Sequence, residues 1–268
     1  MPSERHLDVV RDAGFDTVRL PVKWSEHPSF ERVDRAVDAA LRRDLHVVLD
    51  VHHFDALSAD PDGQAPRFLA LWSQIAEHYA SASDRLCFEL LNEPHDPLTA
   101  ERWNDLLAEA LAVVRASNPE RAVLVGPVRW NIVDALPTLR LPGDEHLIAT
   151  VHYYSPFRFT HQGADWLEGA GEWLGTSWGS DAERARVRSD LEGAAAWARA
   201  QRRPLFLGEF GTLDTADLAA RAAWTTLVRE EAERLGIGWA YWDFATDFGA
   251  FDVDQHAWRA PLRQALLG

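Results

Sequence analysis

Cysteine and long apolar runs are nearly absent from this chain of 268 residues. The one cysteine, Cys87, has no partner for an internal disulfide, and its surroundings in "RLCFELL" favour a core position. No apolar stretch approaches the roughly 18 residues that a membrane-spanning helix needs. No secretion signal is recognisable before Ser3. We therefore expect neither a disulfide scaffold nor a membrane-spanning segment.

Positive charge is also scarce. The chain has 27 Lys and Arg residues against 42 Asp and Glu residues, for a formal net charge of −15. Phosphate backbones and acidic membrane surfaces would repel such a chain, so we expect no nucleic-acid or membrane partner. Polyanionic polysaccharides are disfavoured as substrates for the same reason, whereas neutral substrates are compatible with this charge.

The composition shows no internal boundary. No linker or low-complexity tract divides the chain, and its hydrophobic fraction of 47% is that of a folded protein. A length of 268 residues is close to the roughly 250 that one α/β barrel needs. We therefore predict a single domain over residues 1–268.

Apolar runs alternate with helical patterns along the whole chain. The helical patterns cover residues 30–43, 66–79, 99–117, 181–201 and 214–235. The apolar runs are continuous, as in parallel strands that are covered on both faces. This rhythm predicts an α/β fold of strand–helix units, a TIM (β/α)8 barrel. The predicted strands end near Leu20, Val51, Leu91, Val125, Val151, Leu207 and within 239–242.

The start of the chain does not fit a complete barrel. Seven strands are visible, whereas the closed fold needs eight. The chain opens directly on a helical pattern, "SERHLDVVRDAGF", with no strand before it. Either the first strand is missing from this chain or the barrel closes in an unusual way. We expect the former, and that the chain is a truncated form of a longer protein. Open strand edges would make it less stable and less active than the complete barrel.

Two glutamates stand at the ends of predicted strands. Glu93 in "CFELLNEPHDP" is followed by Pro94, and Glu209 in "RRPLFLGEFGT" is followed by Gly211. Strand C-termini of a barrel open onto one face, where side chains from distant segments converge. There, two glutamates could serve as proton donor and nucleophile on a glycosidic bond. The alternative for each is a capping role at the next helix.

Other polar or aromatic residues also end the predicted strands. Each one has a structural interpretation, such as an arginine paired with a structural acid or a hydrogen-bonded core histidine. Several of them in register are harder to explain by packing alone, which favours an active site. They are Arg19 in "TVRLPVKW", His52 and His53 in "VVLDVHHF", Asn92 beside Glu93, His152 and Tyr154 in "ATVHYYSP", and Trp242 in "WAYWDF".

Three of these motifs together resemble glycoside hydrolase family 5, the cellulase and mannanase barrels. They are "LLNEPHD", "FLGEFG" and the long segment "VHYYSPFRFTHQGADW". The resemblance runs from the first helix to the C-terminus and is nearest to bacterial endoglucanases with glucomannan side activity. Family members begin with a strand and a sugar-binding loop, which this chain lacks.

The resemblance implies a retaining β-glycosidase that cleaves β-1,4-linked glucans. Glu93 would be the acid/base and Glu209 the nucleophile, and Asn92 would hydrogen-bond the 2-hydroxyl of the sugar. Arg19 and Tyr154 would keep Glu209 ionised. The reactive-sugar subsite would be shaped by His52 and His152, flanked by His53 and floored by the ring of Trp242.

The segment after His152 is rich in aromatic residues, which suit either internal packing or stacking on sugar rings. We expect Trp173 to bind substrate, and Trp166 and Phe159 to pack. The tryptophans outside this segment are expected mostly in the core or against helices. These are Trp24, Trp130, Trp197, Trp224 and Trp258.

Two rival interpretations remain. A metal-dependent hydrolase could use Asp50, His52, His53, His152 and Glu209, but adjacent histidines in a strand point to opposite sides. A sugar-binding barrel without turnover would follow if the missing strand spoiled the geometry of the subsite. We expect no metal or cofactor, a β-linked oligo- or polysaccharide substrate, and a monomer. The substrate polymer is extracellular, so we expect secretion, or a cytoplasmic location if the start is genuine.

Overall fold

The computed structural model describes residues 4–26 and 29–268. The chain divides into two compact units. The first unit comprises Met1–Thr150 and Ala200–Pro204, and the second comprises Val151–Arg199 and Leu205–Gly268. The expectation of one domain over 1–268 stays a prediction.

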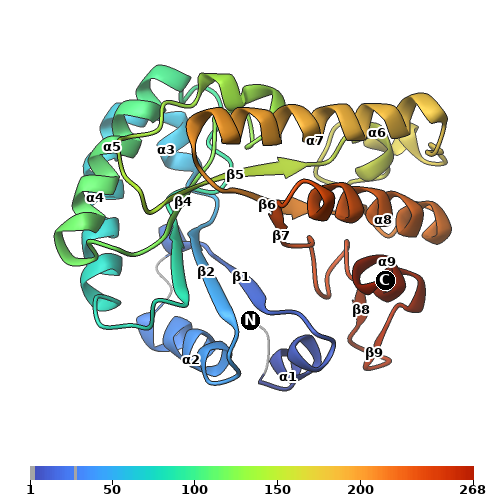
Figure 1. The fold of residues 1–268 in the computed structure, drawn as a ribbon, viewed down its shortest axis with the longest axis horizontal. Helices are drawn as coiled ribbons and strands as arrows, with labels where there is room; N and C mark the ends of the chain where they lie inside the picture. Colours follow the sequence, from blue (N-terminus) through green and yellow to red (C-terminus); the bar gives the residue numbers. More distant parts are fainter. Residues whose placement is uncertain (1–3, 27–28) are drawn as a thin grey trace. The chain divides into compact units, whose positions relative to one another are not determined.

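The strands of the first unit are parallel (Figure 1), and most of their residues are apolar. Leu20 pairs with Leu49, and Leu49 pairs with Phe88 on the next strand. Such runs are typical of strands that are covered on both faces, as the sequence predicts. The strands are β1 (Thr17–Val22), β2 (His46–Val51), β3 (Leu86–Glu89), β4 (Val123–Val125) and β5 (Leu147–Tyr153), which continues into the second unit.

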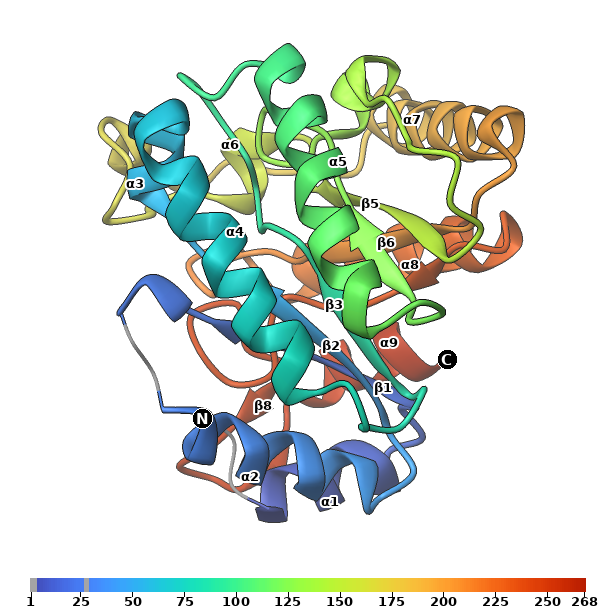
Figure 2. The ribbon, with the colours of Figure 1, turned by 90° about the vertical axis from the view of Figure 1, so that its left-hand side faces the viewer.

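Helices alternate with these strands, and polar residues cap their starts. Ser29 accepts a hydrogen bond from the backbone N–H of Arg32, and Thr99 accepts one from Arg102. Figure 2 shows the two longest helices of this unit, α4 and α5, side by side. The helices are α1 (Glu4–Asp12), α2 (Phe30–Leu41), α3 (Asp55–Ala59), α4 (Pro61–His78) and α5 (Ala100–Ser117), with 3-10 turns η1 (Trp24–Glu26) and η2 (Val133–Thr138).

Helix α4 begins earlier than the sequence predicts. The expected start was Pro66, whereas the helix starts at Pro61, in its first turn, where a missing N–H costs nothing. Asp60 caps this end by accepting from the backbone N–H of Gly63. The predicted start was wrong because Pro61, not Pro66, occupies the first turn, and Pro66 lies inside the helix.

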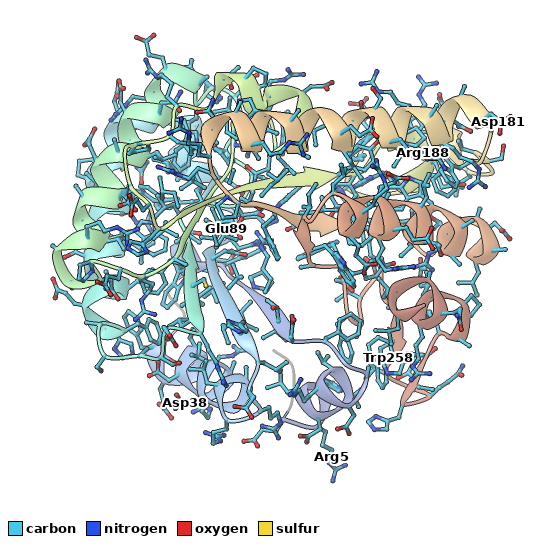
Figure 3. The ribbon with its side chains drawn as sticks, viewed as in Figure 1. Arg5, Asp38, Glu89, Asp181, Arg188 and Trp258 are labelled. Carbon is cyan, nitrogen blue, oxygen red and sulfur yellow. The ribbon has the colours of Figure 1, made fainter. Side chains whose placement is uncertain are left out.

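The second unit pairs β6 (Leu205–Phe210) with the short strand β7 (Gly238–Trp239). Its long helices α7 (Asp181–Gln201) and α8 (Leu218–Arg234) are joined by ion pairs. Arg188, labelled in Figure 3, lies 3.0 Å from Glu231. The remaining elements are α6 (Phe157–Thr160), η3 (Ala170–Trp173), β8 (Phe251–Asp252), β9 (Ala257–Trp258) and α9 (Ala260–Leu267).

The strand order in the described residues is β1-β2-β3-β4-β5-β6-β7, with β8 and β9 in a separate antiparallel pair. All seven strands expected from the sequence are present, and the last, β7, ends at Trp239, within the predicted 239–242. In the described residues no strand lies before α1, as the sequence predicts. No helix in the described part of the chain is long and apolar enough to cross a membrane.

Candidate active site

Arg19 on β1 lies at the centre of a buried polar cluster in the first unit. Its side chain is 4% exposed. Its guanidinium donates twice to the carboxylate of Glu89, at 2.6 and 3.0 Å, and once to Oδ1 of Asn92, at 2.8 Å. It also lies 3.0 Å from Asp50. Asp50 and Glu89 face one another in register on β2 and β3, so two buried carboxylates need this cation between them.

Arg19 thus pairs with two structural acids, Asp50 and Glu89, which is the structural interpretation of this arginine given above. Asp50 entered the sequence argument only as a metal ligand, and Glu89 was missed. The available signal was an acid inside the apolar run "CFELL", where an unpaired charge would be costly. The proposed action of Arg19 on Glu209 stays a prediction.

His52 and His53 follow β2, and both are neutral near pH 7. Burial, followed by the charge of Arg19, lowers the pKa of His52 to about 3. Burial, followed by the neighbouring His52, lowers the pKa of His53 to about 4. Nδ1 of His52 lies 3.3 Å from Asp50.

The rings of His52 and His53 contact one another, so the expectation that these adjacent side chains point to opposite sides is wrong. Their centroids are 4.1 Å apart in an edge-to-face arrangement. The strand ends at Val51 and His53 has a left-handed backbone, with φ of 48°, so the alternation of a strand no longer applies. Even so, in the described residues these two rings do not join Asp50 in a cluster of three that could hold a metal ion.

Glu93 stands four residues after the end of β3. Its φ is 49°, a left-handed conformation that turns the chain sharply after Asn92. Burial is the main cause that raises the pKa of its carboxyl group to about 7, while Arg19 and His95 oppose the rise. A large share of Glu93 therefore carries a proton near neutral pH, as a general acid requires.

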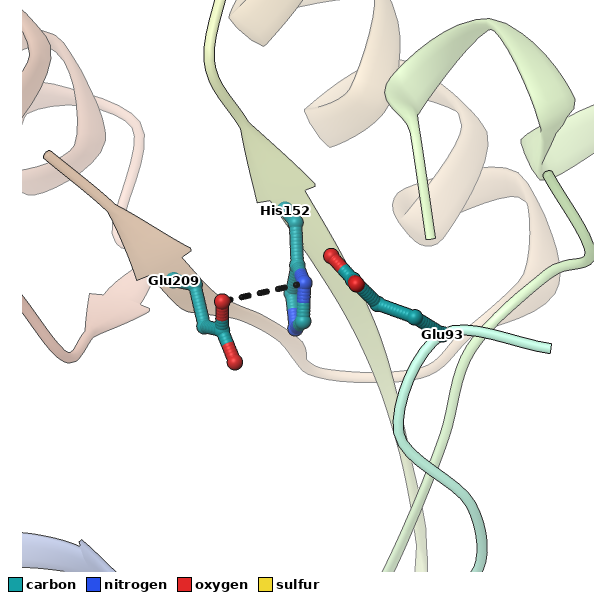
Figure 4. Close-up of side chains that lie close together, drawn as sticks. All are labelled: Glu93, His152 and Glu209. Atoms are coloured by element: carbon teal, nitrogen blue, oxygen red, sulfur yellow. Dashed lines mark ion pairs between the residues drawn. The ribbon is translucent and has the colours of Figure 1, made fainter. Parts of the chain in front are cut away.

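Glu209 lies in β6, in the second unit, and is buried among hydrogen-bonding groups. The hydroxyl of Tyr154 donates to Oε2 of Glu209 at 2.8 Å. Nδ1 of His152, at the end of β5, lies 3.6 Å from the same oxygen (Figure 4). Donation from Tyr154 favours the ionised carboxylate, which a nucleophile needs.

Trp242 lies beside the strand that carries Glu209. Its backbone N–H donates to the carbonyl of Phe210 at 2.8 Å. A side chain at Gly211 would place its Cβ 1.8 Å from the carbonyl oxygen of Trp242. The "GEFG" motif therefore ends in glycine because the backbone of Trp242 passes too close for any other residue.

The aromatic segment after β5 is partly packed and partly open. Phe159 is buried, as predicted, and Trp173 is half-buried against the cluster of Leu213 and Phe248, with the guanidinium of Arg158 5.9 Å from its ring. Trp166 is 54% exposed. Its ring still packs against His161 and Phe248, as predicted, with centroid distances of 6.4 and 6.5 Å.

His161 of the same segment was missed by the sequence argument. Its ring stacks on Phe157 with centroids 4.0 Å apart, and Nδ1 lies 2.9 Å from the hydroxyl of Thr160. Burial lowers its pKa to about 4, so it is neutral near pH 7. A lone histidine among aromatic residues carries no pattern that would single it out.

Trp130 is more exposed than the sequence predicts. It is 49% exposed, whereas a position in the core or against a helix is expected; Trp24 and Trp224, for which the same is expected, are buried. Its ring stacks on His95 with centroids 5.0 Å apart, two residues beyond Glu93. Three consecutive left-handed residues, 129–131, turn the ring outward.

Comparison with known proteins identifies the family. The model of the cellulase family, glycosyl hydrolase family 5, matches residues 2–247. Endoglucanase H of Acetivibrio thermocellus is 31% identical over 97% of this chain, which spans 29% of that protein's length. The chain therefore belongs to the cellulase family, glycosyl hydrolase family 5, and is a glycoside hydrolase.

Solved structures confirm the fold class. The structure of Cel5A from Thermotoga maritima in complex with cellobiose is 40% identical, with a TM-score of 0.97, and covers 99% of this chain and 90% of that one. Its complex with mannotriose gives a TM-score of 0.97 at 39% identity, over 99% and 90% of the two chains. The α/β fold of the TIM-barrel type is thus confirmed.

Proposed function

We propose that the protein hydrolyses β-1,4-linked glucans with retention of anomeric configuration, and that it also accepts glucomannan or mannan. Relatives that carry endoglucanase names support the glucan. Cel5A of Thermotoga maritima has been solved with both cellobiose and mannotriose, which supports the wider range. Ring stacking tolerates changes in hydroxyl configuration, so one cleft can serve both sugars.

The observation that carries this proposal is the opposite tuning of two glutamates. Glu93 keeps its proton up to about pH 7 because the burial of its carboxyl group raises its pKa, whereas Glu209 accepts a hydrogen bond from Tyr154 that favours its ionised form. A proton donor and an anionic nucleophile are the two groups that a retaining glycosidase needs.

The reaction takes two steps. Glu209 attacks the anomeric carbon while Glu93 protonates the departing glycosidic oxygen, which forms a glycosyl-enzyme. Glu93, now ionised, takes a proton from water, and the resulting hydroxide equivalent displaces Glu209 from the sugar. Two inversions give net retention. This mechanism requires the two carboxyl groups to lie about 5 Å apart, since no water stands between them in the first step.

The other site residues bind the sugar or act on Glu209 in this proposal. The amide of Asn92 binds the 2-hydroxyl, a contact that strengthens in the transition state. Arg19 and Tyr154 keep Glu209 ionised, and Tyr154 donates to it. The remaining side chains shape the sugar subsite or stack on the sugar ring: His52, His53, His152, Trp173 and Trp242.

We further propose that the enzyme acts outside the cell as a monomer. Its proposed substrate is a polymer too large to enter a cell, and the net charge of −15 leaves neutral polysaccharides as the compatible class. Detection of the protein in the culture medium of its host, and a hydrodynamic mass near 30.1 kDa for this chain, would support both points.

The test is product analysis on a panel of cellulose, mixed-linkage glucan, glucomannan, mannan and xyloglucan, together with a chromogenic aryl cellobioside. We expect release of oligosaccharides from glucan and glucomannan. Binding to these polymers without any turnover would instead identify a non-catalytic sugar-binding barrel. Activity that is lost in chelator and restored by a divalent cation would support the metal-dependent alternative.

A further inference from the structure

Glu89 has no part in the proposed chemistry, yet it is fully buried, as is Asp50 of the same cluster. The side chain of Glu89 is 0% exposed and, in Figure 3, it is labelled among the strands of the first unit. It binds Arg19 through two nearly parallel hydrogen bonds, at 2.6 and 3.0 Å. Such a bidentate pair fixes the plane of the guanidinium as well as its position.

The fixed guanidinium in turn sets the orientation of Asn92. Nη2 of Arg19 donates to Oδ1 of Asn92 at 2.8 Å. Because Arg19 can only donate, the oxygen of the amide must face it and the nitrogen must face away. Asn92 is therefore held in one of the two flipped orientations that its side chain could adopt.

The nitrogen of Asn92 is left without an acceptor. Asn92 is 3% exposed, and its Nδ2 makes no hydrogen bond to any described residue. A buried donor without a partner costs free energy, so the site is built for an acceptor that a ligand brings. In the proposed reaction that acceptor is the 2-hydroxyl oxygen of the reactive sugar.

We propose that Glu89 is a positioning residue that acts on catalysis through Arg19 and Asn92. It holds Arg19 so that the amide nitrogen of Asn92 is presented to the sugar 2-hydroxyl. This inference rests on the proposed glycosidase function.

The test compares an aryl β-cellobioside with its analogue that lacks the 2-hydroxyl on the reactive glucose. Glu89→Gln turns one end of the side chain into a donor, which opposes the N–H groups of Arg19. We expect the ratio of kcat/KM for the hydroxylated over the deoxygenated substrate to fall about tenfold or more relative to wild type, the effect of one hydrogen bond that forms in the transition state. In an Asn92→Ala background the same change should add little further loss on the hydroxylated substrate.

Asp144→Asn provides the matched control. Asp144 accepts from Arg115 at the same two distances, 2.6 and 3.0 Å, but neither residue contacts Asn92. This variant should leave the ratio unchanged. If Glu89→Gln does not fold by circular dichroism, Glu89→Asp keeps the charge, shortens the reach and should lower the ratio in the same direction.

An equal loss on both substrates, or an unchanged ratio, would show that Glu89 serves stability alone and would overturn the inference. If the wild-type protein hydrolysed neither substrate, the proposed function itself would be wrong. If the wild type distinguishes the two substrates and a Glu89 variant distinguishes them equally well, the inference about Glu89 is wrong, but the proposed function stands.

Discussion

Glu93 and Glu209 are chemically identical residues with different surroundings. Burial raises the pKa of the Glu93 carboxyl group to about 7, whereas Glu209 accepts a hydrogen bond from the hydroxyl of Tyr154. The environment therefore assigns the two roles, and each assignment can be tested at a single position.

The pH dependence of kcat/KM tests the protonation of Glu93. Burial raises the pKa of this carboxyl group to about 7, so the protonated form persists below that value and is lost as the pH rises through it. We expect activity on a substrate with a poor leaving group to fall on the alkaline side near pH 7. Glu93→Gln should abolish this limb. An alkaline limb that survives in the variant would assign the acid to another residue.

Replacement of Glu209 tests the nucleophile. Glu209→Gln keeps the shape and the hydrogen bond to Tyr154 but removes the attacking charge, so kcat should fall by several orders of magnitude. The dissociation constant for a cello-oligosaccharide, measured by calorimetry, should change little. Near-normal turnover of an aryl cellobioside by this variant would rule out Glu209 as the nucleophile.

Replacement of Glu93 by alanine should affect substrates unequally. Substrates with good leaving groups need no acid, so their glycosyl-enzyme still forms and then accumulates because no base activates water. Azide needs no base, and its addition should restore turnover and yield a glycosyl azide. Failure of azide to accelerate the variant on any activated substrate would contradict a two-step role for Glu93.

At the scale of elements, β6 and the segment around Trp242 are joined by a close backbone approach. A Cβ at Gly211 would lie 1.8 Å from the carbonyl oxygen of Trp242, so Gly211→Ala must displace one of them. We expect a loss of about 1–3 kcal/mol in the free energy of unfolding, measured with urea, together with reduced activity.

Gly193 on α7 is the matched control for this substitution. A Cβ there meets no atom within 4 Å, so Gly193→Ala should raise the free energy of unfolding by about 0.5–1 kcal/mol through better helix propensity. If Gly211→Ala were as stable as wild type, the close approach would not constrain the fold.

The strands and long helices could be predicted because their apolar periodicity depends on burial alone. The run that ends near Val51 and the helical pattern over 181–201 match β2 and α7 closely. Starts of helices were less certain, as at Pro61, because capping depends on a few local contacts that the pattern does not contain.

Site residues could be predicted where a motif fixes them at the end of a strand. Asn92 and the two glutamates were proposed in this way, and their roles stay predictions. The exposure of Trp130 was not predicted because ring orientation in irregular segments depends on backbone turns such as the left-handed residues 129–131. Glu89 was missed because its role depends on Arg19, 70 residues away in the chain.

For the molecule as a whole, charge and family agree on a neutral polymer as substrate. A net charge of −15 repels anionic chains, and the family model covers residues 2–247, almost the whole chain. The chain spans 29% of the length of endoglucanase H of Acetivibrio thermocellus.

The central claim is that Glu93 and Glu209 cleave a β-glycosidic bond in two displacements. Proton NMR during the first minutes of hydrolysis of a cello-oligosaccharide, before the product mutarotates, tests it most directly. We predict that the β-anomer of the new reducing end appears first and the α-anomer grows in later. Initial release of the α-anomer would mean a single displacement by water and would contradict the account.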